Sequence, residues 1–130
     1  MKREKNYSFA AKAGVNFGNH HHNDIGSFII EKKDEQILCD LGCPEYTAEN
    51  FGENRYKIIN NSSLGHSVPI VFGEAQESGE EYFGTISYDE KLKIDLKNAY
   101  KKAPNELIRE FEFKQNAVVL TDSLTAYATV

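Results

Sequence analysis

Short apolar runs alternate with clusters of turn-forming residues along most of this chain, and that alternation limits the fold to a few all-β architectures. Residues 91–96 place polar and apolar side chains in regular alternation, which is the pattern of a strand with one buried face. Only Asp89 and Glu90 separate this run from the apolar run 82–88, so the two runs together predict a β-hairpin.

The same criteria predict strands at 25–31, 36–41, 55–60, 66–72, 107–113 and 117–121. Turns are predicted at 32–35, 61–65 and 114–116, where charged residues, Asn, Ser and Gly gather. Residues 96–102 predict only a helical turn that Pro104 would end, and residues 124–130 are interpreted as a strand cut short. We therefore expect an all-β fold, an antiparallel β-sandwich built of hairpins with little or no helix.

The length of 130 residues fits a single domain spanning 1–130, and the net charge of −5 disfavours nucleic acid and anionic membranes as partners. No apolar stretch reaches the roughly 18–20 residues of a membrane helix. The basic start at 1–5 is not followed by the apolar segment of a signal peptide. Composition therefore indicates a globular domain and leaves its compartment open.

Three consecutive histidines, His20, His21 and His22, are followed by Asn23, Asp24 and an apolar run. A polyhistidine tag is longer and lies at a terminus, so we interpret this cluster as part of the domain. If the segment enters a strand, His20 and His22 project from one face about 7 Å apart, and His21 projects from the other. That arrangement would suit a metal ligand beside a catalytic or substrate-binding group.

Two imidazoles and one carboxylate are a common ligand set for zinc, and His22, Asp40 and His66 could supply it from three segments. The hairpin register would place Asp40 opposite a residue near position 27, so a bulge or offset is needed to bring it to His22. From the residues alone, a surface histidine and a turn carboxylate remain the alternative. Cys39 and Cys43 lack the second pair of a zinc knuckle, and we expect Cys39 to be an inert core thiol.

Several motifs follow one another along the chain: NHHHNDIGSF at 19–28, LCDLG at 38–42, Tyr46-Thr47, Arg55-Tyr56 and NSSLGHSVP at 61–69. Together they resemble the heparinase II/III-like family of polysaccharide lyases. The resemblance covers about residues 14–76, and more loosely 95–100 and 109–122. It implies a β-sandwich, in agreement with the strand pattern.

The resemblance also implies roles for individual residues. His20 would line the substrate cleft beside Asn19, and Tyr46 matches a recurrent tyrosine whose alternative role is strand packing. His21 falls at a variable position between two motif histidines, and is expected to face solvent or to be packed. Asp24 is expected to brace the loop by accepting backbone N–H groups, with metal binding as the alternative. The residues that match the family's zinc ligands are His22, Asp40 and His66, so Zn²⁺ is the expected cofactor.

Members of this family cleave uronic-acid-containing polysaccharides by β-elimination, so an acidic polysaccharide is the implied partner. Their helical toroid domain, which precedes the sandwich and supplies a tyrosine acid/base, has no counterpart in these residues. We therefore expect the chain to be an excerpt of a longer lyase and inactive alone. A periplasmic or secreted location is implied, with a cytoplasmic one as the alternative.

Two other readings stay open at this point. The first is a non-catalytic carbohydrate-binding or structural module, in which exposed aromatic residues such as Tyr46 and Phe51 stack on sugars. The second is a zinc hydrolase, in which the metal activates water.

Overall fold

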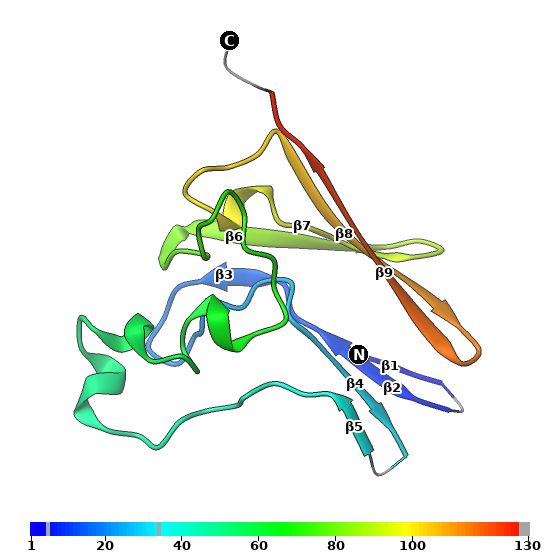
Figure 1. Cartoon of the computed structure of the whole chain (residues 1–130), viewed down its shortest axis with the longest axis horizontal. Helices are drawn as coiled ribbons and strands as arrows, with labels where there is room; N and C mark the ends of the chain where they lie inside the picture. The colour runs from blue at the N-terminus through cyan, green and yellow to red at the C-terminus, as the bar shows by residue number, and fades with distance from the viewer. Residues whose placement is uncertain (5, 34, 128–130) are drawn as a thin grey trace.

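Two antiparallel β-sheets pack against each other in the computed structural model, which describes residues 1–4, 6–33 and 35–127 (Figure 1). The first sheet has the order β1-β2-β4-β5. Its strands are β1 (Lys2–Arg3), β2 (Ser8–Ala11), β4 (Phe28–Lys32) and β5 (Glu35–Leu38). The second sheet has the order β3-β6-β7-β8-β9. Its strands are β3 (Gly14–Asn16), β6 (Gly79–Tyr88), β7 (Leu92–Asp95), β8 (Glu106–Lys114) and β9 (Ala117–Thr125).

The predicted antiparallel sandwich built of hairpins is confirmed. Strands β6 to β9 follow one another as a meander, and β7 pairs with β6 and β8 on either side, through Ile94 opposite both Ile86 and Arg109. The helical turn expected within 96–102 is the 3₁₀ segment η4 (Lys97–Ala99). None of the described helices is long and apolar enough to cross a membrane.

Two predicted strands are wrong: 55–60 and 66–72 lie outside both sheets. The first contains the 3₁₀ segment η2 (Arg55–Lys57), and the second is mostly irregular. Asn61 explains part of the difference, because its side-chain amide donates to the carbonyl of Arg55 (3.0 Å) and its backbone N–H to that of Ile58 (3.0 Å). Such local bonds compete with strand pairing. The short strands β1, β2 and β3 were not predicted.

Two other sequence predictions fall partly on undescribed residues. The turn at 32–35 includes Asp34, and the terminal strand at 124–130 includes 128–130; these residues lie outside the described structure.

The core lies between the two sheets and is built on aromatic rings. Phe9 and Phe28 of the first sheet meet Phe111 of the second, with ring centroids 4.8 and 5.0 Å from Phe111. Arg109 is also buried in this layer, at 3 % exposure. It forms a bidentate pair with Asp122 (2.8 and 2.7 Å) and donates through Nη1 to the carbonyls of Gly26 (2.8 Å) and Ser67 (2.5 Å). Arg109 therefore fastens two loops to the second sheet.

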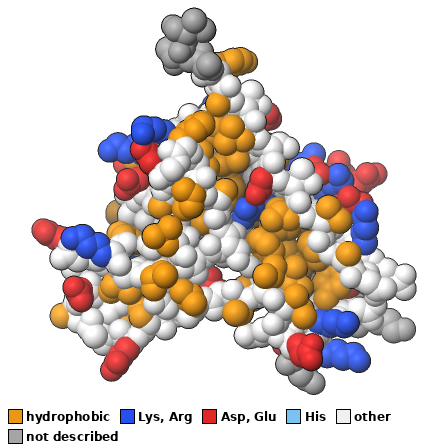
Figure 2. Space-filling model, in the orientation of Figure 1, with side chains coloured by type: hydrophobic (Ala, Val, Ile, Leu, Met, Phe, Trp, Pro, Cys, Tyr) orange, Lys and Arg blue, Asp and Glu red, His pale blue; other side chains and the backbone are white. Residues whose placement is uncertain are grey.

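Part of the inner surface of the sandwich is open. Leu120 lies in register with Phe111, and Ile86 with the buried Ile94, yet Leu120 is 39 % and Ile86 is 52 % exposed. Figure 2 shows hydrophobic side chains gathered between the two sheets and along the face of the second sheet. The two sheets therefore overlap only partly.

A long excursion between β5 and β6 carries most of the polar motifs. It includes η1 (Ala48–Phe51), η2 and η3 (Ser63–Gly65) and lies beside one end of the sandwich (Figure 1). Long connections without strands in compact domains are often binding or active-site segments.

Candidate metal centre

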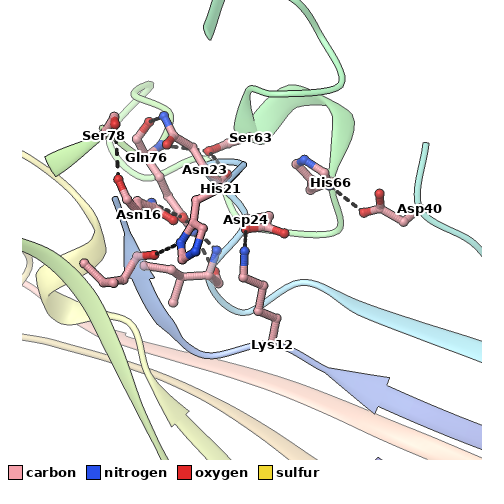
Figure 3. Close-up of polar contacts among 12 residues, drawn as sticks. Lys12, Asn16, His21, Asn23, Asp24, Asp40, Ser63, His66, Gln76 and Ser78 are labelled. Atoms are coloured by element: carbon pink, nitrogen blue, oxygen red, sulfur yellow. Dashed lines mark hydrogen bonds and ion pairs between the residues drawn. The ribbon is translucent and has the colours of Figure 1, made fainter. Parts of the chain in front are cut away.

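His22 lies in the irregular loop between β3 and β4, so the segment His20–His22 does not enter a strand and the alternation of faces considered for it does not apply. The next residue explains why. Asn23 donates its backbone N–H to Asn61 (2.9 Å), and its carbonyl accepts from the hydroxyl of Ser63 (2.7 Å). Its side-chain amide donates to the carbonyl of Gln76 (3.1 Å; Figure 3). The loop is thus fixed to the 60–76 excursion instead of to a neighbouring strand.

This attachment brings His22 to His66. The centroids of the two imidazole rings are 5.2 Å apart with an interplanar angle of 35°. The His66 side chain is fully buried, whereas His22 is partly buried. Asp40 contacts this pair through His66, because its Oδ2 lies 2.5 Å from Nδ1 of His66 (Figure 3). The acidic residue whose ligand atom lies close to both histidines is Asp24, which was not expected as a ligand.

The β-bulge between Ile30 and Glu31 does not supply the offset toward His22, because it pairs Ile30 with Leu38 and so shifts the register away from His22. Asp40 instead reaches His66 because the chain leaves the sheet after Leu38.

Both ring nitrogens of His66 face acceptors. Nδ1 meets the Asp40 carboxylate, and Nε2 lies 2.9 Å from the carbonyl oxygen of Asn60. A neutral imidazole has only one N–H group and cannot donate to both. The arrangement therefore suits either a ring protonated on both nitrogens or a cation in place of one proton.

Asp24 lies close to both His22 and His66. Single ligand atoms of His22, Asp24 and His66 lie within 4.8 Å of one another. The expectation that Asp24 accepts backbone N–H groups is replaced by an ion pair between its side chain and Lys12 (Figure 3). The sequence carried no signal for this role, since Lys12 and Asp24 meet only through the fold.

Imidazole nitrogens and carboxylate oxygens are the donor types that zinc accepts, so these residues fit the ion. Zinc–ligand bonds of about 2.0–2.1 Å place tetrahedral ligand atoms about 3.3 Å apart, so binding requires the 4.8 Å group to contract. Either Asp24 or Asp40 could serve with the histidines, and the same donors are compatible with other divalent cations.

The electrostatic environment favours the forms that bind metal. Burial, followed by the nearby charge of His66, lowers the pKa of His22, which keeps its imidazole neutral near neutral pH. Burial acts to raise the pKa of Asp40, but the hydrogen bonds from His66 and from the Gly42 N–H outweigh it, so the net shift is downward. Asp40 is therefore ionised over the whole neutral range.

Gly65 sits where three segments of the centre meet. A Cβ atom at this position would lie 2.3 Å from the carbonyl oxygen of Ile59 and 3.1 Å from a methyl group of Leu41. Ile59 immediately precedes Asn60, and Leu41 immediately follows Asp40. Asn60 and Asp40 are the two residues that face the His66 ring. Close approach of the backbones therefore depends on glycine here.

The candidate catalytic residues Asn19 and His20 are exposed on the same loop. The His20 ring meets Tyr46 and Phe51 edge-on, with centroids 6.1 and 5.7 Å away. Tyr46 is 61 % exposed and lies outside the strands, so the alternative of strand packing for this residue is wrong. A hydrogen bond and charge interaction with Cys43 raise the pKa of Tyr46, which keeps its hydroxyl protonated as a donor.

Arg55 holds the loop that carries both His20 and His22. Its guanidinium donates to the backbone carbonyls of Gly18 (3.3 Å) and His21 (3.0 Å), on either side of His20. The predicted strand at 55–60 gave Arg55 no site role, although the Arg55-Tyr56 pair is one of the motifs of the resemblance. Cys39 and Cys43 are both exposed free thiols, so the prediction of a core thiol at Cys39 is wrong, because the chain leaves the sheet after Leu38.

Neither a scan of protein-family profiles nor a search of curated proteins finds a match for this chain.

Proposed function

We propose that this domain is the zinc-binding β-sandwich domain of a polysaccharide lyase that cleaves uronate-containing glycans by β-elimination. One observation carries the proposal most strongly. His22, Asp40 and His66, which the heparinase II/III-like resemblance names as ligands, come from distant segments and converge, with His22 and His66 5.2 Å apart and Asp40 bonded to His66.

The proposed metal site is structural. His22 and His66, with Asp40 or Asp24, would hold the ion, and the bound ion would cross-link the loop around His22 to the 60–66 excursion. That cross-link would fix the position of His20 on the same loop, two residues from His22.

β-Elimination requires that the uronate carboxylate be neutralised before the neighbouring C5 proton becomes acidic enough to remove. We assign this task to the Asn19 amide and the His20 imidazole, which are exposed and can donate hydrogen bonds to that carboxylate. The imidazole of His20 is a type of group that can transfer the proton at C5, and the hydroxyl of Tyr46 can donate to the departing oxygen. The expected helical domain would supply the principal acid/base and the opposite wall.

A second candidate function is supported by a separate observation. Tyr46 and Phe51 stack on each other in an exposed position, as the aromatic residues of a non-catalytic carbohydrate-binding module would. Glycan binding without an unsaturated product, even with the helical domain supplied, would favour this candidate.

The test is the metal content of the purified, untagged chain, measured by elemental mass spectrometry, with His22→Ala and the matched variant His21→Ala. His21 is exposed and adjacent, and its ring contacts the carbonyl of Val15 (3.0 Å) instead of the candidate centre. We expect one zinc per chain in the wild type and His21→Ala, and none in His22→Ala. Zinc absent from all three after supplementation, or retained by His22→Ala, would refute the proposed centre.

A further inference from the structure

Two large aromatic side chains are stacked on the surface beside His20 instead of being buried. The rings of Tyr46 and Phe51 have centroids 5.7 Å apart and planes within 17° of each other, yet Tyr46 is 61 % and Phe51 52 % exposed. Aromatic rings gain most of their stabilising free energy from burial, so an exposed stack retains apolar surface that a ligand can cover.

Hydrogen bonds brace the segment that carries the stack, although it belongs to no sheet. Asn50 is 4 % exposed, and its side-chain oxygen accepts from the backbone N–H (2.7 Å) and the hydroxyl (2.9 Å) of Thr47. Arg55 ties the following turn to the carbonyls on either side of His20. A surface whose side chains are already ordered loses little conformational entropy when a ligand binds.

We infer that Phe51, together with Tyr46, forms a stacking platform for one pyranose ring of the bound glycan, with His20 at its edge. A pyranose presents an apolar face of C–H groups and a polar rim of hydroxyls. The aromatic stack matches that face, and the exposed polar groups of Asn19 and His20 match the rim. The identity of the glycan as a uronate polymer rests on the proposed function; the stacking itself does not.

The size of the platform argues for a sugar instead of a protein partner. Two aromatic side chains offer roughly 150–250 Å² each, well below the roughly 800 Å² that each partner buries in a stable protein interface.

Charge adds a constraint on the ligand. Glu45, Glu49 and Glu53 flank the aromatic residues in sequence and are exposed, so they disfavour a uronate carboxylate close to them. Asn19 and His20 are exposed and can instead donate hydrogen bonds to such a carboxylate.

The test is a nuclear magnetic resonance titration of the zinc-loaded full chain with a tetrasaccharide of a uronate polymer and with a neutral cello-tetraose. Wild type is compared with Phe51→Ala, Phe51→Tyr and the control Phe72→Ala, whose phenylalanine is also 52 % exposed. We expect the dissociation constant to rise about tenfold or more in Phe51→Ala, to stay within about twofold in Phe72→Ala, and to be largely preserved in Phe51→Tyr. Unchanged amide spectra away from residues 18–22 and 46–51 would show that Phe51→Ala is folded.

The outcomes separate this inference from the proposed function. Equal dissociation constants for Phe51→Ala and Phe72→Ala would overturn the platform and leave the metal centre intact. Binding of cello-tetraose alone, weakened by Phe51→Ala, would support the platform and refute the uronate assignment. Binding of neither tetrasaccharide to the wild type would overturn the platform, whatever the zinc content.

Discussion

The substitution Arg109→Lys tests whether one buried guanidinium holds the site loops to the second sheet. Lysine keeps the positive charge but has a single ammonium, which cannot replace a planar fork that bonds both oxygens of Asp122 and two carbonyls. If the ammonium stays with Asp122, the carbonyls of Gly26 and Ser67 lose their charged donor. Two such bonds at about 1.5 kcal/mol each predict a loss of about 3 kcal/mol in the free energy of unfolding.

For a domain of this size, about 3 kcal/mol corresponds to a fall in Tm of about 10 °C, measured by differential scanning calorimetry. The matched control is Arg3→Lys on the short strand β1, where the arginine is exposed and the change should be below about 0.5 kcal/mol. Since Ser67 adjoins His66, and Gly26 lies two residues from Asp24, zinc affinity should fall as well. A Tm for Arg109→Lys within 2 °C of Arg3→Lys would refute this reasoning.

Three further predictions concern single residues. Burial raises the pKa of Tyr100 to about 12, so Tyr100 loses its proton at a lower pH in the unfolded chain than in the folded one. The free energy of unfolding should therefore fall by about 3 kcal/mol between about pH 10 and pH 12. Urea unfolding at several pH values should show this fall, and an identical fall in Tyr100→Phe would contradict the assignment. If the proposed function holds, the chain combined with the expected helical domain should form unsaturated uronate, and His20→Ala should abolish this product while zinc content stays at one per chain. Loss of zinc would mean that His20 is a ligand. Cys39→Ser should leave zinc content and Tm unchanged because the thiol is exposed; loss of the metal would indicate a thiolate ligand.

The hairpins β6–β7 and β8–β9 could be predicted because their information is local, whereas the pairing of β7 with β8 was not predicted. Alternation of side chains along 91–96 and the two-residue turn before it determine which residues pair and which face is buried. The short strands β2 and β3 gave no such signal, since SFAA and GVN are too brief to show a period. Their pairing partners, β4 and β6, are distant in sequence.

The candidate site was less predictable for the same reason. His22, Asp40 and His66 were named through motif resemblance, but residue patterns could not show that His66 would be buried between Asp40 and Asn60. Its surroundings depend on bonds across long stretches of chain, such as those from Asn61 and Ser63 to Asn23. Where hydrogen bonds between distant segments determine the conformation of a loop, the hydrophobic periodicity of the sequence carries no information about that conformation.

The close approach at Gly65 has a consequence for how this centre tolerates mutation. Any Cβ there must displace the Ile59 carbonyl and would also crowd the Leu41 side chain. Ile59 adjoins Asn60 and Leu41 adjoins Asp40, the two residues that face the His66 ring. In a saturation library, this position should therefore be as restricted as the imidazoles themselves, although it contributes no atom to the coordination chemistry. Because Gly65 has no side chain, it would then limit which substitutions around the candidate centre the fold accepts.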